Sequence, residues 1–298
     1  MKGPTRNTTD GAVYLDLRRM AKADGRATDE LLTLYALEGF LDRLSTSRRA
    51  GDLVLKGGVL LAAYESRRPT RDIDLQATHL TNDASTVLAL VRAIAATHKD
   101  DGLVYDTGNA TAEVIRDEDD YTGIRVTLIC RLSRARIPFH VDVNVGDPIW
   151  PTPGHVDVPR LLGGCITVRG YPLSMVFAEK IVTAVERGTV NTRWRDYADI
   201  ALLSATHDVD GDELSASIGV VAAHRKVALI PLDEALAGYA EVAQGKWRAW
   251  VRKQRLIDRL PEDFAVVLQD VLVFAGPAVG RTATAQTWDH LLRGWTPH

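Results

Sequence analysis

The sequence lacks any run of eighteen apolar residues, and its start, Met1 to Pro4, has no apolar signal core. A helix that crosses a bilayer needs about twenty apolar residues, and a secretory leader needs a shorter apolar core behind its charged end. We therefore expect neither a membrane-spanning nor a secreted protein, and no membrane partner.

Cysteine is also scarce. The chain has Cys130 and Cys165, both in apolar surroundings and without the CxxC spacing of metal or redox sites. Disulfide frameworks belong to oxidising compartments and to cysteine-rich chains. The pattern favours two buried free thiols in a reducing cytosol, so we expect a cytoplasmic protein.

Aromatic residues make up 6% of the 298 residues, whereas hydrophobic residues as a whole make up 46%. Most of the core must therefore be aliphatic, within a composition that is ordinary for globular proteins. The formal net charge of −3 gives no general attraction to nucleic acid. Any nucleic-acid partner would need a local basic patch.

The apolar pattern predicts an N-terminal half that mixes helices and strands. From Leu15 to Leu44 apolar residues recur at helical spacing, which indicates two helices divided near Asp24-Gly25. The next predicted elements are a strand at 52–56, a helix at 59–64, a strand at 71–77 and a helix at 81–98 capped by Thr81 or Asn82. A three-strand meander follows at 113–116, 124–132 and 137–145, with an acidic turn over 117–120.

Residues 146–172 carry five prolines and several glycines, which indicates a loop-rich linker. Beyond it the pattern is helical. The predicted helices cover 173–187, 193–205, 211–224, 232–244, 247–259 and 261–275, with a short last helix near Trp288. We therefore predict an α+β protein, with a mixed sheet flanked by helices in residues 1–150 and a helical domain in residues 151–298.

Two aspartates carry the strongest chemical signal. Asp72 and Asp74 lie two apart on a predicted strand, so both carboxylates point from the same face. Nucleotidyl transfer uses divalent metal, and Mg²⁺ prefers hard oxygen ligands of this kind. Upstream, Gly57-Gly58 precedes a predicted helix, where glycine lets the backbone approach a phosphate and the free amides of the helix point at it.

A third carboxylate usually completes such a site, and Asp142 is the best candidate. It lies in the middle of a predicted strand among apolar neighbours, where an unpaired acid is costly. There it would bind metal and orient the attacking hydroxyl, or act as its general base. Each feature alone has an ordinary explanation: a solvated DxD, a plain glycine turn, a salt-bridged Asp142. The ordered set favours a nucleotidyltransferase that uses Mg²⁺ or Mn²⁺ and takes an NTP as substrate.

The stretch Leu55–Gly58, followed by Arg71–Leu75, resembles the opening motif of the AbiEii family. These proteins are the nucleotidyltransferase toxins of AbiE-type and MenT toxin–antitoxin systems. Residues 178–184 are similar to the family's lysine-bearing helix, and residues 193–200 are similar to its R-x-x-D-x-x-D-[LI] motif. The resemblance covers roughly residues 53–203 and implies a polymerase-β-like domain in the N-terminal half. It departs from the family at Gly58, where many members have a serine that contacts a triphosphate oxygen.

The resemblance also implies roles for residues outside the acidic set. Lys180 would contact the nucleotide phosphates, and Asp196 would complete the catalytic set from the helical half. The implied nucleotide-binding residues are Lys56, Gly57, Gly58, Arg71, Lys180 and Arg193. Two alternatives stay open. Lys180 could instead be a surface residue paired with Glu179 or Glu186. Asp196 could instead pair with Arg193 or Arg195 on the same helix.

MenT-type members add nucleotides to the 3′ end of tRNA, which implies a tRNA acceptor and a cognate antitoxin for this chain. Residues 245–259 contain six Lys or Arg and one Asp, so they form the basic patch that RNA would need. The predicted RNA-binding residues are Lys246, Arg248, Trp250, Arg252, Lys253 and Arg255, with Trp247 and Arg259 beside them. The alternative is an amphipathic surface helix whose tryptophans face the core.

Two other functions share the same acidic residues. The first is modification of a small molecule or a protein, as antibiotic-modifying or AMP-transferring enzymes carry out. The second is that of a non-catalytic binding module, which keeps the fold of the enzyme but has lost its activity. The nature of the labelled acceptor distinguishes the first from a tRNA-modifying toxin, and the absence of magnesium-dependent NTP binding would identify the second.

Overall fold

The computed structural model describes residues 3–116 and 122–298. The acidic turn expected over 117–120 lies outside the described residues. The chain divides into two compact units, of which the first comprises Met1–Asp147 and Pro153–Tyr171, and the second Pro148–Thr152 and Pro172–His298. This division differs from the expected boundary at 150/151, because residues 153–171 belong with the N-terminal sheet.

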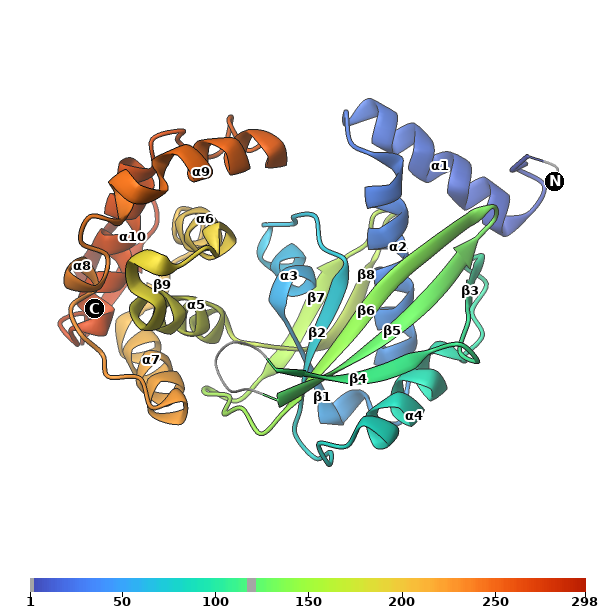
Figure 1. Ribbon diagram of the computed structural model, residues 1–298, viewed down its shortest axis with the longest axis horizontal. Helices are drawn as coiled ribbons and strands as arrows, with labels where there is room; N and C mark the ends of the chain where they lie inside the picture. The colour runs from blue at the N-terminus through green and yellow to red at the C-terminus, as the bar shows by residue number, and fades with distance from the viewer. Residues whose placement is uncertain (1–2, 117–121) are drawn as a thin grey trace. The chain divides into compact units, whose positions relative to one another are not determined.

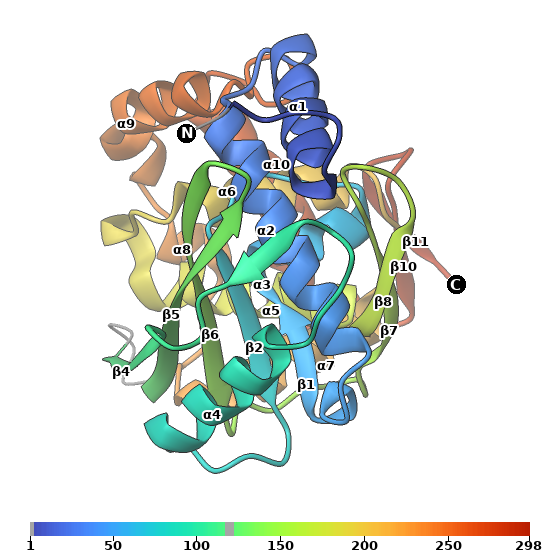
Figure 2. The same cartoon turned by 90° about the vertical axis from the view of Figure 1, so that its right-hand side faces the viewer.

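Two helices open the first unit. They are α1, Thr9–Ala23, and α2, Thr28–Ser45, and they are divided where the Asp24-Gly25 pair predicts. The hydroxyl of Thr8 accepts a hydrogen bond from the amide of Gly11 and so caps α1. Helix α2 is apolar over most of its surface, because it packs between α1 and the sheet (Figure 2).

The strands of the first unit form one mixed sheet in the order β3-β5-β6-β2-β1-β8-β7, with β4 paired to β5. They are β1 Leu53–Lys56, β2 Asp72–Ala77, β3 Leu103–Tyr105, β4 Thr111–Arg116, β5 Thr122–Leu132, β6 Ala135–Val145, β7 Gly154–Pro159 and β8 Cys165–Gly170. The predicted meander is confirmed as β4-β5-β6. The pairs β2–β6 and β1–β8 are parallel, and the other pairs are antiparallel.

Short helical segments connect these strands. They are η1 Ala50–Asp52, α3 Gly57–Leu60, η2 Leu61–Tyr64 and α4 Ala84–Ala95. The segment after β1 begins at Gly57 rather than at Val59, and it is a single α-turn that continues as a 3₁₀ turn. Asp83 caps α4 through the amide of Thr86, so the predicted cap at Thr81 or Asn82 is wrong. Helices α2 and α4 pack together on the sheet (Figure 2).

The predicted linker over 146–172 is wrong, because it contains the antiparallel hairpin β7–β8. Its prolines are compatible with strands because β7 is an edge strand and Pro159 is its last residue. Gly163 and Gly164 lie in the turn with φ of 94° and 80°, a conformation that glycine adopts at little cost. The hairpin joins the sheet through the parallel pair β8–β1.

The second unit is mainly helical. Its helices are α5 Leu173–Arg187, η3 Gly188–Val190, α6 Trp194–Ser204, α7 Gly211–Arg225, α8 Leu232–Ala235, α9 Tyr239–Gln254 and α10 Phe264–Val279. Helix α9 runs through Gly245, where a break was predicted. The residue before it, Gly238, has a left-handed backbone conformation. The last predicted helix is wrong, since Trp288 lies in β10 of a small sheet formed by β9 Val209–Asp210, β10 Gln286–Asp289 and β11 Gly294–Pro297.

Helix α10 is the centre of the second unit and packs against α6, α7, α8 and α9 (Figure 1). Within residues 3–116 and 122–298, no helix combines the length and apolar character that a membrane crossing requires. Both cysteines are free thiols. Cys130 is buried as predicted, whereas Cys165 is exposed, because it lies at the start of β8 on the turn of the hairpin.

Candidate functional site

Three neighbouring strands bring the predicted acidic residues together. Asp74 on β2 is the register partner of Lys56 on antiparallel β1 and of Asp142 on parallel β6. The residues that precede Asp74 and Asp142 in their strands, Ile73 and Val141, are fully buried. Strand alternation therefore places the carboxylates on the opposite face of the sheet from these core side chains.

Oxygen atoms of Asp72, Asp74 and Asp142 all lie within 4.8 Å of one another. Asp72 and Asp74 are half-buried, and Asp142 is buried. Three carboxylates at this separation are hard oxygen ligands gathered closely enough to share a divalent cation. The structure therefore brings together the three residues that the sequence predicts as metal ligands.

The electrostatics of Asp74 show why a cation would be favourable there. Burial and the negative charges of Asp72 and Asp142 raise the pKa of Asp74 to about 7, although Lys56 and Arg68 oppose this shift. Three carboxylates without a cation repel one another, so the site stores unfavourable charge that a bound metal would neutralise. The donor set and its charge thus fit a divalent metal.

Gly57 is required by its position beside Asp74. Its φ is 66°, and a Cβ atom at this residue would lie 1.8 Å from Oδ2 of Asp74. Any other residue would therefore displace the carboxylate. The segment between β1 and η2 thus approaches the acidic set with bare backbone, as the glycine pair predicts.

Arg125 is a neighbour of the site that the sequence analysis did not identify. It lies on β5 opposite Asp142, and its Nε and Nη2 atoms donate hydrogen bonds of 2.8 and 2.7 Å to the two oxygens of Asp142. This bidentate ion pair fixes the orientation of Asp142. The sequence offered no signal for the pair, because it depends on the register of β5 against β6.

The two predicted cationic nucleotide ligands of the first unit have different surroundings. The Nζ atom of Lys56 lies 3.2 Å from Oδ2 of Asp147 and 5.6 Å from the ring centre of Tyr171. Arg71 is exposed immediately before β2. Arg68, which was not predicted, contributes positive charge at Asp74. The basic residues Lys56, Arg68 and Arg71 thus flank the acidic strand.

A buried ion cluster occupies the second unit. Nζ of Lys180 on α5 donates to Asp196 at 2.9 Å and to Asp199 at 2.8 Å, both on α6. Arg193 also donates to Asp196 at 2.7 Å, so the helix pair weighed as an alternative is present. Burial alone would raise the pKa of Asp196, but the charges of Lys180 and Arg193 lower it to about 2.

Asp199, the second aspartate of the R-x-x-D-x-x-D-[LI] motif, is a partner of Lys180 that the sequence analysis did not identify. Its spacing of three residues from Asp196 was the available signal, because residues three apart share a helix face. Lys180 thus binds both aspartates of α6.

The basic residues of α9, and Arg255 directly after it, are at the surface. Lys246, Arg248, Arg252, Lys253 and Arg255 are all exposed, and Trp250 is half-buried. Trp247 is instead fully buried, where its ring stacks on Phe264 and its Nε1 donates to the carbonyl of Pro261 at 3.0 Å. Trp247 therefore fits the core alternative, and it is not available to stack on a base.

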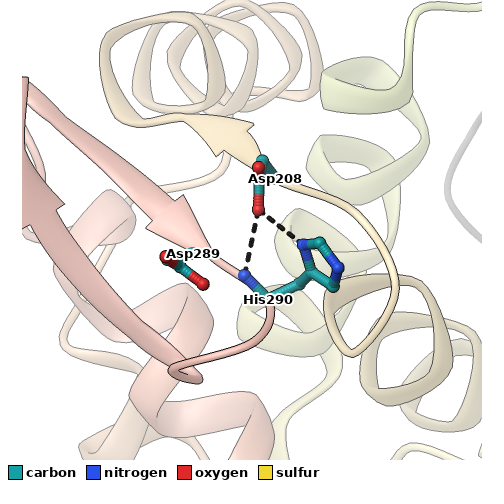
Figure 3. Close-up of side chains that lie close together, drawn as sticks. All are labelled: Asp208, Asp289 and His290. Carbon is teal, nitrogen blue, oxygen red and sulfur yellow. Dashed lines mark hydrogen bonds and ion pairs between the residues drawn. The ribbon is translucent and has the colours of Figure 1, made fainter.

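A second group of acidic and histidine side chains lies at the small sheet (Figure 3). Oδ1 of Asp208 accepts from the amide of His290 at 3.0 Å and lies 2.6 Å from its Nδ1. Oδ1 of Asp289 accepts from the amides of Leu291 and Leu292. These hydrogen bonds explain why the three side chains lie together: they stabilise the turn between β10 and β11.

The chain is similar to one protein family and to several solved structures. The family model of the nucleotidyl transferase AbiEii toxin of type IV toxin–antitoxin systems matches residues 39–270. No curated protein matches significantly. Among solved structures, JHP933 from Helicobacter pylori has 12% identity and a TM-score of 0.36, with 78% of this chain and 99% of that one covered. A second H. pylori protein, provisionally described as a nucleotidyltransferase, has 12% identity, a TM-score of 0.34 and coverages of 70% and 90%.

Proposed function

We propose, since this chain belongs to the AbiEii family of nucleotidyl transferase toxins of type IV toxin–antitoxin systems, that it transfers a nucleoside monophosphate from an NTP to the 3′ end of tRNA. Such a transfer would block aminoacylation and translation. The observation that carries the proposal is the gathering of Asp72, Asp74 and Asp142 within 4.8 Å, next to the bare backbone of Gly57. In this proposal the first unit, which holds most of the expected residues 1–150, forms a polymerase-β-like nucleotidyltransferase domain.

The acidic residues would hold Mg²⁺ or Mn²⁺. When bound, such a metal neutralises triphosphate charge and activates the attacking oxygen. Asp72 and Asp74 supply oxygen ligands from one strand, and Asp142 supplies a third from the next strand. Because Arg125 holds both oxygens of Asp142, a fixed ligand that orients the acceptor hydroxyl is a better role for Asp142 than a mobile general base.

The nucleotide would bind through basic groups and backbone. Gly57 is exposed and would present its main chain to the triphosphate, with the buried Gly58 next to it, and Lys56 and Arg71 would supply positive charge. Lys180 from the second unit would contact the phosphates. Its two carboxylate partners hold the ammonium group in one place.

The acceptor would be bound by the exposed basic residues of α9. Their charges suit the phosphates of RNA, and Trp250 offers a partly exposed ring for stacking. Membership of a toxin–antitoxin family implies an antitoxin partner. Transfer to a small molecule or to a protein uses the same acidic residues and is the alternative outcome of the test below.

The test is transfer of label by purified full-length protein. The protein is incubated with Mg²⁺, each α-labelled NTP in turn and total tRNA. We expect one NTP to label RNA, and we expect Asp74→Asn to abolish the labelling while Asp258→Asn, an exposed acid on the second unit, leaves it intact. Label in a protein band or in an aminoglycoside instead of RNA would establish the alternative, and no transfer from any NTP to any acceptor would reject the proposal.

A further inference from the structure

Thr70 lies two residues before Asp72 and is buried, with 8% of its surface exposed. Its hydroxyl donates a hydrogen bond to Oδ1 of Asp72. A bond to one oxygen fixes the rotation of the carboxylate, and with it the direction of the second oxygen. Thr70 therefore controls the orientation of the Asp72 carboxylate relative to Asp74 and Asp142.

Gly58 adjoins the same hydroxyl. A Cβ atom at Gly58 would lie 2.9 Å from Oγ1 and 3.1 Å from Cβ of Thr70, and 3.3 Å from Nη1 of Arg68. Unlike Gly57, Gly58 is not among the glycines with positive φ, so its backbone conformation does not demand glycine. The space around residue 58 does demand glycine, because a side chain there would push against Thr70 and, through Thr70, against Asp72.

We propose that Thr70 is a positioning residue that sets the orientation of Asp72 for metal binding, and that residue 58 is glycine because Thr70 occupies the space of its side chain. The inference rests on the proposed function, since it assigns metal binding to Asp72. Hydrogen bonds that orient metal-binding carboxylates are worth about 10–100-fold in metal affinity.

The first test is Mn²⁺ binding to the full-length protein, followed by the electron paramagnetic resonance signal of free Mn²⁺. Thr70→Val keeps the shape and removes the hydroxyl, and we expect it to weaken Mn²⁺ binding by about 10–100-fold. Thr70→Ser keeps the hydroxyl and should bind almost as the wild type does. Thr78→Val is the matched control, because its hydroxyl bonds the carbonyl of Asp52 away from the acids.

The second test couples the two positions. We expect Gly58→Ala to weaken Mn²⁺ binding when Thr70 is present and to have a smaller further effect in the Thr70→Ala background, since the 2.9 Å contact with Oγ1 is then gone while the 3.1 Å contact with Cβ remains. Additive effects of Gly58→Ala and Thr70→Ala would overturn the inference. So would a Thr70→Val variant that binds Mn²⁺ as tightly as the wild type.

These readouts separate the inference from the proposed function. If the wild type binds Mn²⁺ through Asp72, as judged by Asp72→Asn, but transfers no nucleotide, the proposed function fails and the Thr70 comparison still decides the inference. If the wild type binds no Mn²⁺ at these aspartates, both are rejected. Thermal unfolding midpoints of the Thr70 variants close to that of the wild type show that the fold is intact.

Discussion

At the scale of single residues, the tightest constraint in the first unit is the approach of Gly57 to Asp74. We predict that Gly57→Ala abolishes metal binding and nucleotide transfer, because a methyl group 1.8 Å from Oδ2 must displace the carboxylate. Gly163→Ala is the matched control: it has the same kind of positive φ but open space around it. Mn²⁺ binding and transfer assays check this, and equal effects of the two substitutions would reduce the role of Gly57 to backbone strain.

The same residue gives a pH dependence. The pKa of Asp74 is raised from 3.8 to about 7, so the folded state keeps a proton that the unfolded state loses above about pH 4. In the metal-free protein, the contribution of Asp74 to stability is therefore complete below about pH 4 and is lost as the pH rises towards 7. We predict that Asp74→Asn raises the thermal midpoint of metal-free protein at pH 8 and has little effect at pH 4.

Two controls accompany this pH series. Saturating Mg²⁺ should remove the benefit of Asp74→Asn at pH 8, because a bound cation compensates the repulsion that the substitution relieves. Asp258→Asn removes one exposed negative charge and measures the effect of net charge alone. A stability gain that stays the same from pH 4 to pH 8 would show that the gain does not come from ionisation of Asp74.

At the scale of elements, Lys180 joins α5 to α6 through two carboxylates, Asp196 and Asp199, that are 4% and 2% exposed. Removal of one member of a buried ion cluster costs about 3–5 kcal/mol, because the remaining charges lose their partner. We predict that Lys180→Met lowers the unfolding midpoint of the chain and abolishes transfer. Lys22→Met, at an exposed site on α1, should change neither. A fully stable but inactive Lys180→Met would assign Lys180 to substrate alone.

The elements also show what sequence could and could not predict. The helices α1, α2, α5 and α7, the meander and the DxD strand follow from apolar periodicity, which depends on local sequence. The hairpin β7–β8 was missed because its prolines and glycines are typical of loops, and they are tolerated here only because β7 is at the edge of the sheet. Helix α9 passes through Gly245 because Trp247 and Ala243 on either side of it are buried.

The candidate site also contains some residues that the sequence could predict and others that it could not. Asp72 and Asp74 were predictable because a spacing of two on a strand fixes a common face. Asp142 could be proposed from its apolar neighbours, but its register opposite Asp74 could not. The contacts of Arg125 and Thr70 depend on strand pairing and on side-chain rotation, which no local pattern encodes.

At the scale of the whole molecule, the chain carries a net charge of −3 but has a group of exposed basic residues on α9, and we expect binding of a polyanion to use that local charge. We predict that Arg248→Glu with Lys253→Glu weakens tRNA binding and lowers the slope of log affinity against log salt by about 2, since each neutralised phosphate contributes about one. Arg252 is a poorer target, because it is paired with Glu262 at 2.6 Å.

The matched control is Arg18→Glu with Lys22→Glu, two exposed residues on α1 that change the net charge of the chain by the same amount. Filter binding over a salt series measures both variants, and Mn²⁺ binding verifies that the acidic set is unaffected. A weaker affinity with an unchanged slope would mean that the α9 substitutions act through structure and not through phosphate contacts. An equal loss in the α1 variant would mean that net charge, rather than the surface of α9, governs the encounter with RNA.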